Sequence, residues 1–348
     1  MSARSVSATP EIAAPETAGP EVAVEAVAAA NGSTPAALIA GAVPPAIEVS
    51  RPVTGLHADL RAWNRRLREY ARLMRFDRPI GTWLLLWPVL WALWLASDGR
   101  PDQKIFVVFV LGVIVMRAAG CVINDFADRD LDPHVKRTRE RPLAARRVSP
   151  REAIVLFVAL MAIALWLVTR LDAFTVQLAF VGAALTMTYP FMKRFFAMPQ
   201  FFLGLSFGGW GVLMVFAAQT GNLPRVAWVL YFSAVIWAVM YDTLYAMADR
   251  DDDIRLGIRS SAILFGDMDR AFIAVMQAMA LFGLWVAGRS MNAGRWYLVG
   301  LGAAALLFLY QQWLIRKRDP AACLRAFSNN NYVGLVIFVG VALDSALG

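Results

Sequence analysis

Long apolar runs separated by short polar segments dominate the chain from residue 80 to its end. Runs such as Ile80–Ser97, Ala153–Thr169 and Tyr332–Leu347 approach the length that a helix needs to cross a membrane, which is roughly 20 residues for about 30 Å of hydrocarbon. The pattern predicts nine membrane-spanning helices in an all-α fold. They lie near residues 80–97, 105–123, 153–169, 174–189, 201–219, 226–245, 271–287, 296–313 and 332–347.

The N-terminal segment has a different character. Residues 1–55 are rich in Ala, Pro and Glu and show no helical or strand periodicity, which predicts a disordered tail before a membrane domain at 56–348. No apolar stretch follows Arg4, as a signal peptide would require, and the tail is too acidic for a mitochondrial transit peptide. We therefore expect a bacterial protein with an unstructured extension.

Composition and charge agree with the membrane assignment. Hydrophobic residues make up 59% of the chain, more than a soluble domain of this size can bury. The net charge of +8 comes from Lys and Arg between the apolar runs, a topology signal that argues against nucleic-acid binding. The connections after the even-numbered spans carry 18 basic residues and the others 6. We expect a multi-pass protein of the bacterial inner membrane with a cytoplasmic N-terminus.

Two of the cytoplasmic connections begin with acid-rich segments. The first runs from Asn124 to Asp132 after the second span, and the second runs from Tyr241 to Asp253 at the end of the sixth. If both are helical, Asp125, Asp128 and Asp132 share one face, and so do Asp242, Asp249 and Asp253. Such acids repel one another unless a cation lies among them, and oxygen ligands of this kind suit Mg²⁺.

Basic residues follow both acid-rich segments. Lys136, Arg137, Arg139 and Arg141 follow the first, and Arg255 and Arg259 follow the second. Carboxylates that hold Mg²⁺, together with cations that hold phosphate oxygens, are what a diphosphate leaving group requires. One acid cluster at a membrane boundary is often solvated loop charge, but two on the same side favour a site. Arg117 lies within the second span, where a charged residue is by default functional or paired.

These segments resemble the two aspartate-rich signatures of the intramembrane aromatic prenyltransferases, most closely those of the branch that acts on 4-hydroxybenzoate. The resemblance extends to Arg78–Pro88, Met116–Cys121, Tyr189–Arg194 and Asn329–Gly334, and it covers the chain from about Leu73 to the end. It implies a nine-helix bundle around a central cavity with the active site at the cytoplasmic side. It also implies Mg²⁺ dependence and transfer of a polyprenyl group from its diphosphate to the ring carbon ortho to the phenol of 4-hydroxybenzoate, in ubiquinone biosynthesis.

The resemblance also implies roles for individual residues. The catalytic and Mg²⁺-binding residues would be Asp125, Asp128, Asp132, Asp249 and Asp253. The substrate-binding residues would be Asn124, Lys136, Arg137, Arg141, Tyr189, Lys193, Arg194, Asp242 and Tyr245. Within this set Arg194 is a candidate for the aromatic carboxylate, with Arg75, Arg78 and Arg117 as substitutes.

The sequence alone is also compatible with other functions. Within the same superfamily the acceptor could be another quinone precursor or haem. A cation-coupled transporter would also place carboxylates in membrane helices. Its site would usually lie near the bilayer midplane, however, whereas these acids lie at one edge. The sequence leaves undecided whether an aspartate or the released diphosphate removes the ring proton.

Overall fold

The computed structural model describes residues 55–135, 138–192, 196 and 198–347, and every regular element in this part of the chain is a helix. Among these described residues, eight helices are long and apolar enough to cross a membrane, and a ninth apolar helix, α3 (Ile80–Leu95), is shorter. The predicted all-α membrane fold with about nine spans is confirmed. The predicted tail before residue 55 lies outside the described residues and stays a prediction.

The membrane-spanning helices follow the predicted apolar runs in order. Together with shorter or polar elements that no apolar run predicted, the helices besides α3 are α2 (Gly55–Leu73), α4 (Gln103–Ala127), η2 (Asp132–His134), α5 (Pro150–Val168), α6 (Ala173–Met192), α7 (Pro199–Leu203), η3 (Gly204–Gly209), α8 (Trp210–Thr220), α9 (Arg225–Leu256), α10 (Ser261–Phe265), η4 (Gly266–Met268), α11 (Asp269–Ser290), α12 (Arg295–Leu314), η5 (Ile315–Lys317) and α13 (Pro320–Leu347).

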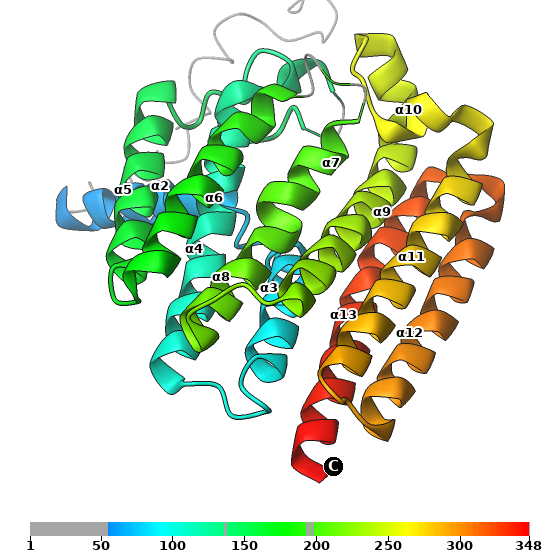
Figure 1. Ribbon diagram of the computed structural model, residues 1–348. Helices are drawn as coiled ribbons and strands as arrows, with labels where there is room; N and C mark the ends of the chain where they lie inside the picture. The colour runs from blue at the N-terminus through cyan, green and yellow to red at the C-terminus, as the bar shows by residue number, and fades with distance from the viewer. Residues whose placement is uncertain (1–54, 136–137, 193–195, 197, 348) are drawn as a thin grey trace, which may run out of the picture. The chain divides into compact units, whose positions relative to one another are not determined.

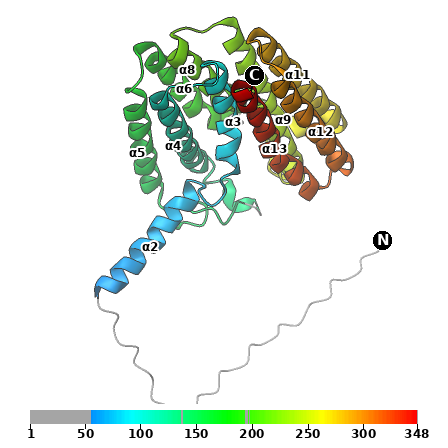
Figure 2. The ribbon, with the colours of Figure 1, turned by 90° about the horizontal axis from the view of Figure 1, so that it is seen from below.

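The membrane helices form two groups with α3 between them. The helices α9, α11, α12 and α13 run side by side in one group (Figure 1). The helices α4, α5, α6 and α8 make up the other group (Figure 2). Helix α3 packs against α4 and α8 on one side and against α13 on the other. The largest apolar core therefore runs through α3, α8, α9 and α13 and joins the two groups.

Helix α13 is tied to three other helices by consecutive asparagines, Asn329–Asn331. In order, their side-chain oxygens accept hydrogen bonds of 3.0, 2.9 and 3.0 Å from Gln311 of α12, Trp237 of α9 and Trp87 of α3. Neighbouring residues of a helix point about 100° apart, so three in a row can face three partners. In a membrane interior such bonds satisfy polar groups that find no water. The asparagine run thus gives α13 a fixed rotation between the two groups.

The predicted span at 201–219 is an interrupted helix. It consists of α7, the π-helical segment η3 and α8. Glycines in η3 lie directly against α9: a Cβ at Gly204 would be 2.9 Å from the Val235 carbonyl oxygen, and one at Gly208 would be 2.5 Å from Ala238 Cβ. The absence of side chains allows this close approach, and the wider π turn is a common feature of functional sites.

The two acid-rich segments have different backbone structures. Helix α9 continues past the predicted end of its span to Leu256, so the whole segment Tyr241–Asp253 is helical, as the assumed face requires. Helix α4 instead ends at Ala127, with Asp128 at its C-cap and Asp132 in the short turn η2. The helical face assumed for the first segment is therefore wrong beyond residue 127. Pro133 explains part of this, because a proline inside an α-helix lacks the N–H that would bond the carbonyl of residue 129 and its ring clashes with that carbonyl.

Candidate active site

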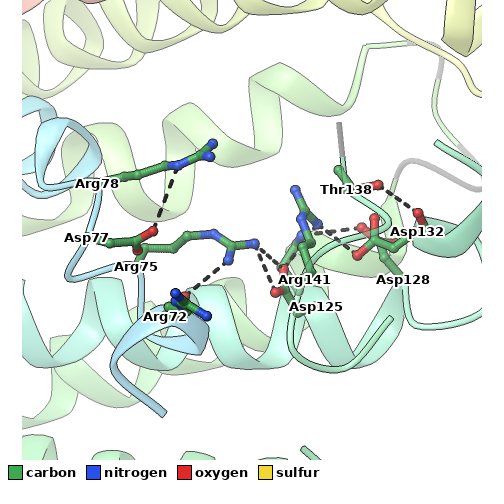
Figure 3. A network of polar contacts seen from close by, with 10 residues as sticks. Arg72, Arg75, Asp77, Arg78, Asp125, Asp128, Asp132, Thr138 and Arg141 are labelled. Atoms are coloured by element: carbon green, nitrogen blue, oxygen red, sulfur yellow. Dashed lines mark hydrogen bonds and ion pairs between the residues drawn. The ribbon is translucent and has the colours of Figure 1, made fainter. Parts of the chain in front are cut away.

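Two arginines hold the first acid-rich segment. Arg75, just beyond the end of α2, contacts both carboxylate oxygens of Asp125 through its Nη2 at 2.8 and 2.9 Å. Arg141 Nη1 lies 3.1 Å from Asp125 Oδ1 and 2.9 Å from Asp132 Oδ2 (Figure 3). The Asp125 side chain is only 2% exposed. A buried carboxylate needs such partners, and here Arg141 joins two acids that the end of α4 separates.

Further hydrogen bonds shape the connection that follows α4. The Asn124 amide nitrogen donates to Asp128 Oδ2 at 3.2 Å, and the Thr138 hydroxyl donates to the Asp132 carbonyl at 2.9 Å. Burial raises the pKa of the Asp132 carboxyl, and the positive charge of Arg141 opposes that rise. The connection therefore keeps Asp132 close to a cation.

A polar cavity of about 130 Å³ lies between the first segment and α9. Six of the residues predicted from the sequence line it: Asn124, Tyr189, Asp242, Tyr245, Asp249 and Asp253. They come from α4, α6 and α9. Of the first segment only Asn124 lines the cavity, and it also donates a hydrogen bond to Asp128, whereas Asp125, Asp128 and Asp132 are not among the lining residues.

Three further polar residues line the cavity, Gln200, Arg259 and Ser260, and of these sequence reasoning missed Gln200 and Ser260. The Gln200 side-chain oxygen accepts a 3.2 Å hydrogen bond from the backbone N–H of Ser261 and so links α7 to the start of α10. A polar residue directly after Pro199, between apolar runs, was the available signal for Gln200. Arg259 was noted as a basic residue after the second segment but was not assigned to the site.

Four predicted substrate-binding residues lie outside the described residues: Lys136, Arg137, Lys193 and Arg194. Their roles stay predictions. Of the substitutes for Arg194, Arg75 is engaged by Asp125, and Arg78 is an exposed side chain 3.9 Å from Asp77. Arg117 lies against the backbone at the start of α3, because a Cβ at Gly81 would be 2.4 Å from its Nη2. A side chain at position 81 would therefore displace the Arg117 guanidinium from its place against α3.

The donor set of the polar cavity suits Mg²⁺. In the described part of the chain, no three Asp, Glu, His or Cys side chains are placed to hold one metal ion together. The cavity nevertheless collects the carboxylates of Asp242, Asp249 and Asp253 and the amide of Asn124. Mg²⁺ commonly takes one or two protein carboxylates and completes its shell with water and substrate phosphates. These residues therefore fit an ion that binds together with a diphosphate.

A larger apolar cavity of about 510 Å³ lies beside the polar one. Residues of α3, α4, α5, α6, η3 and α8 line it, among them Met116, Leu165 and Phe207. The Phe207 ring meets the Tyr189 ring edge-to-face with centroids 6.0 Å apart. Because Tyr189 lines the polar cavity and Phe207 the apolar one, this aromatic pair lies where the two spaces adjoin.

Comparison with known proteins gives the family of this chain. Residues 85–336 match the UbiA prenyltransferase family. The chain belongs to this family. The 4-hydroxybenzoate octaprenyltransferase of Alkalilimnicola ehrlichii is 56% identical over 288 residues, which is 83% of this chain and 96% of that protein. The 4-hydroxybenzoate octaprenyltransferase of Pseudomonas aeruginosa strain UCBPP-PA14 is 49% identical over 301 residues, 86% of this chain and 99% of that protein. This chain is thus a membrane prenyltransferase.

Solved structures of UbiA homologues share the fold. The homologue from Aeropyrum pernix K1, without ligand, has a TM-score of 0.66 at 24% identity and covers 75% of this chain and 97% of its own. A homologue from Archaeoglobus fulgidus bound to GPP and Mg²⁺ has a TM-score of 0.59 at 17% identity, with 79% and 99% covered. The helical bundle that the described residues form, with about nine spans, is therefore the fold of the UbiA family, as the sequence resemblance implied.

Proposed function

We propose that this UbiA-family enzyme transfers a polyprenyl group from polyprenyl diphosphate to the ring carbon ortho to the hydroxyl of 4-hydroxybenzoate, in ubiquinone biosynthesis. One observation carries the proposal: a polar cavity between two acid-rich segments adjoins a large apolar cavity. A substrate with a charged head and a long hydrocarbon tail needs this pair of spaces. The names of the curated relatives supply the acceptor and an octaprenyl donor.

The apolar cavity is the proposed place of the prenyl chain. Its lining is almost entirely hydrocarbon and aromatic side chains, which favour an apolar ligand by removing its surface from water. The first isoprene unit would then lie near Tyr189 and Phe207, where the two cavities adjoin. The carbon that reacts would then lie at the edge of the polar cavity, next to the diphosphate.

The acid-rich segments are the proposed diphosphate site. Asp128, Asp132, Asp249 and Asp253 would hold the cation, and Lys136, Arg137 and Arg141 would contact phosphate oxygens. When bound, Mg²⁺ supplies positive charge that stabilises the departing diphosphate. Support for Mg²⁺ comes from the donor set and from the homologue bound to GPP and Mg²⁺. The predicted metal role of Asp125 competes with a structural role, because its two oxygens face Arg75 and Arg141.

The reaction follows from these positions. The allylic C–O bond breaks, and its electron pair leaves with the diphosphate, whose growing negative charge the arginines and lysines stabilise. The ring carbon of 4-hydroxybenzoate attacks the allyl cation and forms the new C–C bond. The ring proton then passes to a carboxylate or to the released diphosphate, which restores the aromatic ring. Arg194 is the proposed partner of the aromatic carboxylate.

The membrane placement belongs to the same proposal. The distribution of Lys and Arg supports a cytoplasmic placement of the acid-rich segments at the inner membrane. Both substrates would then reach the site from that side, the prenyl diphosphate through the bilayer and 4-hydroxybenzoate from water.

Incubation of the purified protein with 4-hydroxybenzoate, a prenyl diphosphate and Mg²⁺ tests the proposal. Mass analysis should find a product that is 4-hydroxybenzoate plus the prenyl group, formed with one equivalent of diphosphate. The Asp249→Asn protein under the same conditions is the control for contaminating activity. Product from another quinone precursor, with none from 4-hydroxybenzoate, would contradict the acceptor and leave the family assignment intact.

A further inference from the structure

Helix α2 has an apolar surface that the rest of the chain does not cover. Trp63 is 61% exposed and Leu67 is 47% exposed. These residues are four apart and therefore lie on the same face of the helix. Neither belongs to a hydrophobic core cluster of the described chain. A large aromatic side chain and an aliphatic one that are exposed together on one helix face indicate an interaction surface.

Basic side chains lie beside this apolar face. Arg65, Arg68 and Arg72 are all exposed and recur at intervals of three and four residues, so they share a second face of α2. Of these three arginines, Arg72 alone forms an ion pair with an acid of the described part of α2, Glu69 at 2.9 Å. A helix with an apolar face and an arginine-rich face is typical of helices that lie in a membrane interface.

The third face of α2 fixes the helix at the end of the membrane bundle where the candidate site lies. Arg66 and Tyr70 contact Glu152 in the first turn of α5, and Glu69 accepts a 2.9 Å hydrogen bond from Arg147, before α5. Helix α5 is a candidate membrane span. Only residues 74–79 separate α2 from the membrane helix α3. The apolar face of α2 is thus held at the level where the chain enters the membrane.

We propose that α2 is a membrane-surface anchor that binds anionic phospholipid in the leaflet on the side of the candidate site. Trp63 and Leu67 insert among the lipid headgroups, and Arg65, Arg68 and Arg72 contact lipid phosphates. Charge complementarity selects this partner, because each basic residue near an anionic leaflet adds to the attraction. The inference does not depend on which aromatic acid the enzyme prenylates.

Lipid binding at α2 also reaches the candidate site. Three residues beyond Arg72, Arg75 contacts Asp125 (Figure 3). Glu69, one turn before Arg72, accepts a hydrogen bond from Arg147. Arg147 lies in the connection between α4 and α5, which also contains Arg141. An α2 that is fixed on the lipid surface therefore keeps Arg75 and the 138–149 connection in place. We expect turnover to increase when the surrounding bilayer carries anionic lipid.

The position of α2 can be measured in the full-length protein. A fluorophore on Leu67→Cys and one on Arg65→Cys report opposite faces of the helix, and the native Cys121 and Cys323 are buried. In vesicles of phosphatidylcholine with phosphatidylglycerol, nitroxide-labelled lipid should quench the label at residue 67, and aqueous iodide should quench the label at residue 65. Equal quenching of both labels by iodide, with none by lipid, would overturn the proposal.

The lipid preference is tested by turnover in two vesicle compositions, phosphatidylcholine alone and with phosphatidylglycerol. The wild-type protein should turn over faster in the anionic vesicles, and Arg65→Gln/Arg68→Gln should lose that stimulation while it keeps its turnover in phosphatidylcholine. Arg289→Gln is the control, because Arg289 is an exposed arginine in the last turn of α11. If the double variant is stimulated as strongly as wild type, the lipid acts elsewhere and the proposal fails.

Discussion

The two acid-rich segments are held in place by different means. The first leaves its helix at Ala127 and depends on side chains from elsewhere, with Arg75 and Arg141 binding Asp125 and Asp132. The second lies within α9, whose own backbone spaces its carboxylates along the polar cavity. Carboxylates in two similar motifs therefore have different roles: those of the first segment also form ion pairs that hold the fold, and those of the second line the cavity. We expect substitutions in the first segment to affect both folding and catalysis, and substitutions in the second to affect mainly catalysis.

Removal of the divalent cation should have the largest effect, because it acts on both segments at once. Without a cation, the carboxylates of the cavity repel diphosphate, so excess EDTA should abolish product formation and added Mg²⁺ should restore it. Product mass in a time course is the measurement. Full activity in EDTA would show that neither segment acts through a metal.

Asp249→Asn isolates the catalytic contribution of the second segment. The side chain keeps its size and its helix but loses a charge at the polar cavity, so kcat should fall by about 10²–10³, the usual effect of losing a transition-state charge interaction. The thermal unfolding midpoint should stay unchanged. Asp251→Asn is the matched control, because Asp251 is an exposed aspartate of the same helix. A similar loss of kcat in both variants would point to the charge of α9 as a whole.

Asp125→Asn probes the first segment. It leaves Arg75 and Arg141 without their shared carboxylate, and breaking a buried ion pair typically costs about 3–5 kcal/mol. We expect a lower unfolding midpoint in detergent together with lower turnover. The exposed Asp130 provides the control, since Asp130→Asn removes the same charge from a side chain that is 80% exposed. A normal unfolding midpoint with kcat reduced as in Asp249→Asn would instead support the predicted metal role of Asp125.

Arg194→Ala should have the smallest and most selective effect. If Arg194 binds the aromatic carboxylate equally in ground and transition states, its loss raises KM for 4-hydroxybenzoate and changes kcat little. KM for the prenyl diphosphate should hardly change. A raised KM for the diphosphate alone would place Arg194 with the phosphate-binding residues, and the carboxylate partner would then be sought among Arg75, Arg78 and Arg117.

The parts of the fold that the sequence predicted are those that local composition determines. Apolar length alone identified the spans, because a membrane helix satisfies its own backbone wherever its neighbours lie. The same reasoning placed Asp242, Asp249 and Asp253 on one helix, since α9 has no glycine or proline inside it. It could not reveal the π-helical turn at Gly204–Gly209, which depends on close contact with α9.

The candidate site was predictable in its residue types but less so in its contacts. The acids, Asn124 and Tyr189 follow from the motifs, and the structure brings six predicted residues to one cavity. The ion pair between Arg75 and Asp125 joins residues 50 positions apart, which no spacing rule anticipates. Helix α2 was overlooked because its apolar residues recur every three or four positions among arginines, and a search for long apolar runs passes over that pattern.

The three asparagines of α13 have a consequence for how the protein is made. The helices α3, α9 and α12 are all synthesised before Asn329–Asn331. The donors Trp87, Trp237 and Gln311 therefore enter the membrane before the asparagines that accept their hydrogen bonds have been synthesised. These three hydrogen bonds can form only after α13 has been inserted. A chain that stops short of Asn329 would lack all three of these hydrogen bonds to α3, α9 and α12.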